Sequence, residues 1–244
     1  MPLIVDLSET PLTPTEIGVD FVWQTRDGGV GLNGVTQIAS PLTGLWELSL
    51  VFEQQSEERV RAYRAFKMKT KGRYIWIRVP IFDPFRVRFA DAGWPEMPEP
   101  VDGPVPVDWT GPVPWSDPTP WAGTDIETTV QIGAIKGAEL IVLDTNAMGD
   151  ALGTGHFISI NDYLYLTTRT HTLQGSGGDY YRPFDIGPPL REAIQPGDVV
   201  KIGRPTILCR LAEDRSGTIR LKFGRYGQPS MEFIEVLQRE APER

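Results

Sequence analysis

The chain has 244 residues and a formal net charge of −8, which is enough length for one large domain or two modest ones. Hydrophobic residues make up 40% and charged residues 23%, which excludes global disorder. No apolar run is close to the length of about 18 residues that a membrane-spanning helix needs. The first residues lack a basic stretch followed by an apolar one, so we expect no signal peptide. The 25 glycines and 22 prolines favour many short strands joined by turns.

The first part of the chain is predicted to form strands. Apolar and polar residues alternate over 19–23 and again over 45–52, where Trp46, Leu48 and Leu50 would share one face of a strand. Turn sequences that contain glycine separate these stretches, as expected for antiparallel strands with short connections.

One helix is predicted, over residues 57–71. Ser56 is a favourable N-cap, the two glutamates after it suit the positive end of the helix dipole, and Gly72 would end the helix. Three apolar side chains form a stripe that we expect to pack against the strand that carries Trp46. The stripe consists of Val60, Tyr63 and Phe66. A strand over 73–80 should follow.

Basic side chains cover much of the remaining surface of this helix. They include Arg59, Arg61, Arg64 and Lys67. A solvated basic face is the plainest interpretation. Nucleic-acid binding would require exposed aromatic side chains beside the bases, whereas the aromatic residues of this helix belong to the apolar stripe. A third hypothesis is that the basic face contacts an acidic surface of a neighbouring subunit.

Charge is distributed unevenly along the chain. Residues 1–58 carry one base and nine acids (net −8), and residues 59–88 carry ten bases and one acid (net +9). Residues 89–200 carry four bases and sixteen acids (net −12), and residues 201–244 carry nine bases and six acids (net +3). This pattern indicates separate structural units. A generic nucleic-acid-binding protein would be basic overall, so we expect no sequence-specific nucleic-acid binding.

The composition changes over residues 94–121, which contain nine prolines and four tryptophans. Regular structure does not tolerate this density of proline, so we expect a loop or an extended linker. An alternative is a segment that lies on a protein surface and is anchored there by its tryptophans, which makes them interface candidates. These are Trp94, Trp109, Trp115 and Trp121.

Short strands after this segment indicate a small β-barrel. They are predicted at 129–135, 139–143, 156–160, 163–168, 199–203 and 206–211. A tight hairpin over 159–164 places Asn161 and Asp162 in a turn that requires positive φ angles. The last segments, 217–223 and 230–237, are expected to leave the barrel and return to the first domain.

The predicted fold is therefore mainly β: a β-sandwich with one α-helix, plus an inserted small β-barrel. We predict three parts. Residues 1–121 form the sandwich with its helix and the Pro/Trp-rich loop, residues 122–204 form the inserted barrel, and residues 205–244 supply closing strands of the first domain.

The sequence offers no catalytic residues, and we expect no cofactor or metal site. His156 and His171 lie in different predicted strands or turns, which argues against a shared metal. The one cysteine, Cys209, excludes an internal disulfide, and it lies between Leu208 and Leu211. A buried and inert thiol is therefore expected rather than a nucleophile.

The order of several segments resembles a family of bacteriophage tail proteins. The segment SPLTGLWELSLVFE at 40–53 leads into ERVRAYRAF at 58–66, which is followed by GRYIWI and then Asp83-Pro84. The segment VPWSDPTPW at 113–121 is similar to a loop of that family, and IQPGDVVKI at 194–202 is similar to a strand of its inserted barrel. The family is that of the distal tail proteins, or closely related minor tail proteins, of long-tailed (siphovirus-like) phages and phage-derived particles.

The resemblance implies a structural protein of the virion and no enzymatic activity. Six copies would form a ring, a homohexamer, that joins the tail tube protein to the baseplate hub protein. Assembly would start from protein made in the host cytoplasm. A net negative chain also suits a conduit for DNA, because it does not bind the phosphate backbone.

Two other classes of function stay open. A carbohydrate-binding module of a tail tip would use exposed tryptophans, with the four of residues 94–121 as candidates, and its partner would be a host-surface glycan. A glycosidase or peptidase of the tail tip would need two acidic residues at a suitable separation among the many acids of this chain.

Overall fold

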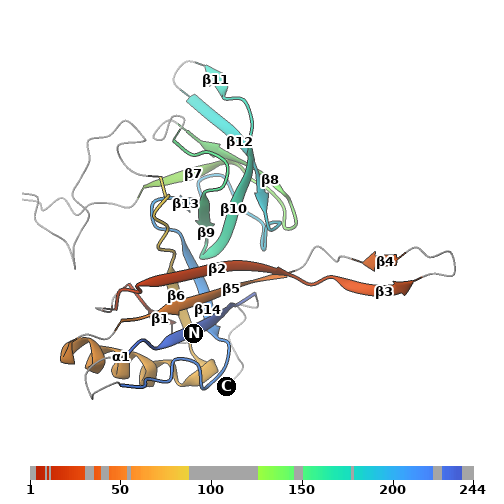
Figure 1. Ribbon diagram of the computed structural model, residues 1–244. Coiled ribbons are helices and arrows are strands. Elements are labelled where there is room, and N and C mark those ends of the chain that lie inside the picture. Colours follow the sequence, from red (N-terminus) through yellow and green to blue (C-terminus); the bar gives the residue numbers. More distant parts are fainter. Residues whose placement is uncertain are drawn as a thin grey trace, which may run out of the picture.

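A computed structural model describes residues 4–8, 10, 12–30, 36–39, 44–53, 56–87, 126–145, 151–176, 179–221 and 227–237. Of residues 26–30, 36–39, 176 and 179 it describes the backbone alone. The fold class predicted from the sequence is confirmed: the described chain is mainly β, with one α-helix and two larger sheets (Figure 1).

The first sheet has six strands in the order β1-β6-β14-β15-β5-β2. Their bounds are β1 Ile4–Asp6, β2 Glu16–Trp23, β5 Gly44–Val51, β6 Trp76–Pro80, β14 Thr206–Leu211 and β15 Ser230–Glu235. The pairing of β1 with β6 is parallel and the other pairings are antiparallel. The sheet thus combines strands from the start of the chain with two strands from its end, and a long excursion of the chain separates β6 from β14.

The second sheet has seven antiparallel strands in the order β10-β9-β13-β7-β8-β12-β11. Their bounds are β7 Glu127–Ile132, β8 Leu140–Asp144, β9 Phe157–Ile160, β10 Tyr163–Thr170, β11 Gln174–Ser176, β12 Asp179–Gly187 and β13 Val199–Lys201. A further pairing between β10 and β12 brings the two ends of the sheet together, so the strands nearly close into a ring (Figure 1). Its interior side chains form a separate core cluster.

The hairpin between β9 and β10 forms as the sequence predicts. Asn161 has φ 52° and Asp162 has φ 60°, so two consecutive residues adopt the left-handed conformation. This matches the type of two-residue turn whose twist fits a β-hairpin, and asparagine and aspartate tolerate it better than most side chains. The turn points one end of the seven-stranded sheet toward the six-stranded sheet.

A two-stranded hairpin continues from β2 and β5. Its strands are β3 (Arg26–Val30) and β4 (Thr36–Ala39), which pair in an antiparallel manner from Arg26 opposite Ala39. In Figure 1 this hairpin, here called the arm, projects away from both larger sheets. Within the described chain, β3 and β4 pair only with each other.

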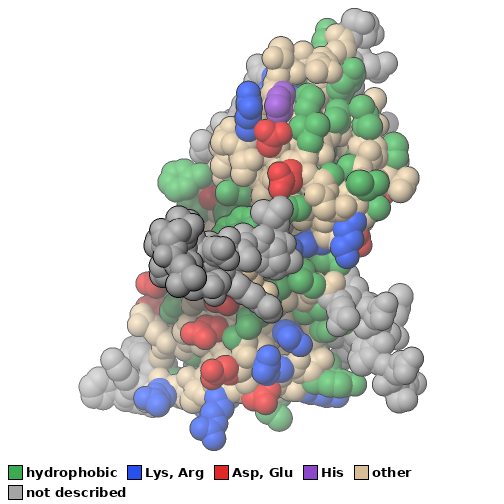
Figure 2. All heavy atoms as spheres, turned by 90° about the vertical axis from the view of Figure 1, so that its right-hand side faces the viewer, with side chains coloured by type: hydrophobic (Ala, Val, Ile, Leu, Met, Phe, Trp, Pro, Cys, Tyr) green, Lys and Arg blue, Asp and Glu red, His purple; other side chains and the backbone are tan. Residues whose placement is uncertain are grey.

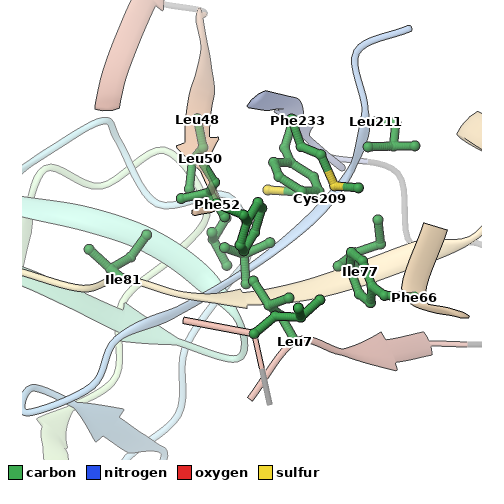
Figure 3. Packing of buried hydrophobic residues seen from close by; sticks show 14 of the residues in the cluster. Leu7, Leu48, Leu50, Phe52, Phe66, Ile77, Ile81, Cys209, Leu211 and Phe233 are labelled. Atoms are coloured by element: carbon green, nitrogen blue, oxygen red, sulfur yellow. The ribbon is translucent and has the colours of Figure 1, made fainter. Parts of the chain in front are cut away.

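Helix α1 (Glu57–Thr70) covers the core face of the six-stranded sheet. The side chain of Ser56 accepts a hydrogen bond from the backbone N–H of Arg59 at 3.2 Å, which confirms the predicted N-cap. The stripe of Val60, Tyr63 and Phe66 is buried as predicted, with exposed fractions of 8%, 0% and 1%. Tyr63 and Phe66 lie in one cluster with Trp46, Leu48 and Leu50, and Figure 3 shows how side chains of this cluster meet.

Several predicted boundaries are wrong in detail. The helix ends at Thr70, because Lys71 already has a left-handed conformation with φ 47°. A short 3-10 turn, η1 (Gly72–Tyr74), follows, so the next strand begins at Trp76 and not at residue 73. The described residues 217–221 form no strand, and residues 222–223 lie outside the described chain.

The strand at 206–211 belongs to the six-stranded sheet, in agreement with the prediction of closing strands over 205–244, although the sequence analysis also counted it among the short strands of the barrel. The segment at 230–235 joins the same sheet, between β14 and β5. The exact domain boundaries stay a prediction, since the predicted loop at 94–121 lies outside the described residues.

Removing the side chain of Phe66 tests the packing of the helix. We expect Phe66→Ala to lower the free energy of unfolding by about 3–5 kcal/mol, because the ring is 1% exposed and its loss leaves a cavity. Urea unfolding of the full chain measures the change. Met68→Ala is the matched control on the same helix, since Met68 is 79% exposed, and it should change stability by less than about 0.5 kcal/mol. Equal midpoints for the two variants would contradict the described packing.

Candidate assembly surfaces

The predicted basic face of helix α1 is present on the protein surface. Arg59, Arg61 and Arg64 are exposed and Lys67 is half-buried. Arg61 forms an ion pair with Glu57 one turn earlier, whereas the other three bases have no acidic partner among the described residues. An exposed ion pair of this kind contributes little to stability. The face is therefore available to a partner without breaking a structural interaction.

The four tryptophans proposed as interface anchors lie outside the described residues. They are Trp94, Trp109, Trp115 and Trp121. Nothing in the described structure therefore bears on their role, or on the carbohydrate-binding hypothesis that rests on them.

The two larger sheets meet at a joint that the sequence analysis did not identify. Arg78 of β6 donates to both oxygens of Asp162, with its Nη2 2.8 Å from Oδ2 and its Nε 3.1 Å from Oδ1. Thr206 donates its hydroxyl to Asp162 Oδ1 at 2.6 Å, and Arg78 Nη1 also reaches Asp6 at 3.2 Å. In addition, the backbone N–H of Leu208 donates to the carbonyl of Asp162 at 3.1 Å. The tip of the β9–β10 hairpin is thus bound to strands of the six-stranded sheet.

The charges at this joint shift the pKa values of both partners. Burial would raise the pKa of the Asp162 carboxyl, but hydrogen bonds from Arg78 and Thr206, with the positive charge of Arg78, hold that pKa below its ordinary value. The hydrogen bond to Asp162 raises the pKa of the Arg78 guanidinium, although partial burial acts in the opposite direction. Both groups are therefore charged over the physiological pH range.

A second ion pair crosses the same joint and is more deeply buried. Arg191 follows β12, and its Nη2 lies 2.9 Å from Oε2 of Glu235, the last residue of β15. The side chains are 10% and 0% exposed. Arg191 also donates to the carbonyl of Gly44 at 2.8 Å, and Glu235 accepts from the backbone N–H of Trp46 at 3.2 Å. The several polar partners of this ion pair offset the free-energy cost of burying its two charges.

One further hydrogen bond and apolar contacts complete the joint. The indole N–H of Trp46 donates to the carbonyl of Leu164 at 2.8 Å, and the side chain of Leu164 belongs to the core cluster of the six-stranded sheet although its strand is β10. The rings of Trp46 and Phe157 meet edge to face with centroids 5.8 Å apart. A residue of the second sheet thus fills space in the first core, which fixes the position of one sheet on the other.

A further surface consists of exposed and half-buried apolar side chains on the outer wall of the seven-stranded sheet. Ile132, Val142 and Pro183 lie side by side across β7, β8 and β12, and Ile132 is 53% exposed. Leu140, 46% exposed, lies further along β8. Figure 2 shows hydrophobic side chains gathered over the upper part of one face of the molecule. Apolar surface of this kind is common where another protein binds.

The remaining residues singled out by the sequence have local partners. His156 accepts a hydrogen bond from the backbone N–H of Gly153 at 3.2 Å, and His171 contacts Asp185 at 2.9 Å. Cys209 is fully buried as predicted, and burial raises the pKa of its thiol. In the described part of the chain no group of three or more His, Cys, Asp or Glu residues is placed to hold a metal ion. Among the same residues, no helix is long and apolar enough to cross a membrane.

No protein-family model matches this chain, and no curated protein is similar to it in sequence.

Replacing Asp162 by asparagine tests the first ion pair. Asparagine keeps the left-handed backbone at low cost, so the change removes the charge and replaces one accepting oxygen by an NH2 group that cannot accept from Arg78 or Thr206. We expect Asp162→Asn to lower the free energy of unfolding at pH 7 by about 1.5–3 kcal/mol. Because the folded-state pKa of this carboxyl is depressed, its contribution is complete above the ordinary pKa near 4 and is lost as the pH falls below that value.

Chemical unfolding of both proteins between pH 3 and pH 7 gives this dependence, with Glu139→Gln, an exposed residue, as the control. A stability difference that is the same at both ends of the pH range would show that Asp162 does not act through its charge.

The buried pair of Arg191 and Glu235 is tested by removing one charge and then both. Arg191→Met leaves the Glu235 carboxylate buried without its cation, so we expect a loss of about 3–5 kcal/mol in the free energy of unfolding. Adding Glu235→Leu to Arg191→Met should restore part of this stability, because the unpaired charge is then removed as well. A double variant that is less stable than Arg191→Met would contradict this account of the joint.

Proposed function

We propose that this protein is a structural component of a phage tail: a distal tail ring protein, made of six copies, that joins the tail tube to the baseplate hub in the virion. The proposal combines the resemblance of the sequence segments to that family with an architecture suited to a scaffold. It assigns no catalytic role to the chain.

The observation that carries the proposal is the arm. β3 and β4 extend the β2–β5 hairpin beyond the sheet and project from the body of the molecule (Figure 1). In the described chain their outer edges have no strand beside them. An unpaired strand edge is a ready template for pairing with another chain, and natural monomers usually avoid it. A projecting hairpin with open edges therefore suits contact with a neighbouring subunit.

The joint between the two sheets gives a second argument. A ring that connects a tube to a hub must hold its parts in a fixed geometry. The buried pair of Arg191 and Glu235 and the entry of Leu164 into the other core favour one relative position of the sheets. The apolar wall with the exposed side chains of Ile132 and Leu140 would then present a defined surface to the tail tube protein or the hub protein.

The assembly state of the purified full-length chain tests the proposal. We expect native mass spectrometry to detect a hexamer at low salt, and negative-stain images to show closed rings. If contacts between charged surfaces contribute, raising the ionic strength should shift the population toward monomers, because exposed charges are screened over about 8–10 Å at physiological ionic strength. A chain that stays strictly monomeric at high protein concentration, at both low and high salt, would contradict a self-assembling ring.

A further inference from the structure

The outer face of the six-stranded sheet is an unpartnered surface. Along β5, Trp46, Leu48 and Leu50 are buried in the core, so Glu47 and Ser49 between them point to the other side. Neighbouring strands continue the same face, since Asp20 of β2 and Ile234 of β15 lie on either side of Glu47. Glu47 and Asp20 are exposed, so nothing in the described chain covers this part of the sheet.

This face is acidic over three adjacent strands. The acids are Glu16 and Asp20 of β2, Glu47 of β5 and Glu232 of β15, all exposed. None of them forms an ion pair with a described residue. Across the strands, Asp20, Glu47, Ile234 and Arg210 are paired in sequence and form one row on this face. Arg210 of β14 is the one base in that row. A basic side chain of another molecule could therefore pair with several carboxylates that form no ion pair within the described chain.

Two of these acids stand directly opposite each other. Asp20 and Glu47 are partners in the register of β2 and β5. Like charges in this position disfavour pairing of the strands, whereas an opposite pair would support it. The sheet therefore carries a small local cost that a positively charged partner would remove.

The basic surface of helix α1 lies on the other side of the same core. Tyr63 and Phe66 pack into the cluster that contains Trp46 and Leu48, whereas Arg64 and Lys69 lie outside the buried stripe of the helix. Both are exposed and have no acidic partner among the described residues. One subunit thus carries a basic face and an acidic face on opposite sides of one domain, and it cannot bring its own two faces together.

We propose that helix α1 of one copy binds the outer face of β2, β5 and β15 of the next copy. The occupant of the acidic sheet face is thus a second copy of this chain, chosen by charge complementarity. The contact joins two different surfaces, so it is head-to-tail and can repeat around a closed ring. A two-fold contact would instead place acid against acid or base against base. The inference rests on the self-assembly proposed above and assigns its contact surfaces.

Single charge reversals test the assignment in the full-length chain. Arg64→Glu makes the helix face less basic, and Glu47→Lys makes the sheet face less acidic. We expect each variant alone to assemble about tenfold or more weakly than wild type at low salt, because the contact then places like charges together. Lys136→Glu and Glu139→Lys are matched controls with the same changes in net charge on exposed residues of the seven-stranded unit, and they should assemble as wild type does.

An equimolar mixture of the two weakened variants is the decisive measurement. The less basic helix face of Arg64→Glu would meet the less acidic sheet face of Glu47→Lys, and the unchanged faces of the two variants would meet each other. Alternating copies therefore place opposite charges together at every contact. We expect the mixture to recover the wild-type oligomer mass, as measured by native mass spectrometry. Far-UV circular dichroism and melting temperature establish that each variant is folded.

The outcomes separate this inference from the proposed function. If the wild-type chain assembles but Arg64→Glu and Glu47→Lys behave like their controls, these faces do not meet, although the ring proposal stands. If both variants are weakened but their mixture does not recover, the two faces are not partners of each other. If the wild-type chain does not self-associate at all, the proposed ring and this contact both fail.

Discussion

The buried ion pair of Arg191 and Glu235 is the interaction on which the arrangement of this molecule depends. Charges taken out of water are costly unless nearly all of their hydrogen-bonding groups are satisfied. Here the guanidinium reaches both oxygens of Glu235 and the carbonyl of Gly44, and it lies 5.5 Å from the centroid of the Phe21 ring. These requirements are met in one relative position of the two sheets, which makes the pair a determinant of geometry as well as of stability.

The same pair also fixes the place where the arm leaves the body. Gly44 opens β5 and pairs with Trp23, the last residue of β2, so the arm begins at this point. A side chain at Gly44 would collide with the carbonyl of Val22 at 2.5 Å and with the Phe21 ring at 2.6 Å, and only glycine fits. Because Arg191 binds the Gly44 carbonyl, the base of the arm is tied to the seven-stranded sheet. The result is a scaffold in which the arm and the seven-stranded sheet keep a fixed position relative to each other.

Local patterns were sufficient to predict the helix, its N-cap, its buried stripe and the β9–β10 turn. Each depends on residues close in sequence, such as Ser56 beside Arg59, or Asn161 beside Asp162. The joint was missed because its partners are far apart: 84 residues separate Arg78 from Asp162, and 44 separate Arg191 from Glu235. The sequence around Asp162 predicted a turn, but nothing near it in the sequence indicated an ion pair. The return of strand 206–211 to the first domain was predicted, but its place between β6 and β15 was not, since strand order depends on long-range pairing and not on the alternation of side chains.

Cross-linking between subunits tests the central claim, that copies of this chain assemble head-to-tail through the helix and the sheet, most directly. Wild-type chains grown in normal and in heavy-isotope medium would be mixed, reassembled and treated with a carbodiimide, which joins lysine amines to carboxylates in direct contact. We expect links of mixed isotope composition between Lys67 or Lys69 of one copy and Glu47, Asp20 or Glu232 of another. Mixed links from these lysines only to acids outside β2, β5 and β15, or no mixed links in an assembled sample, would contradict the account.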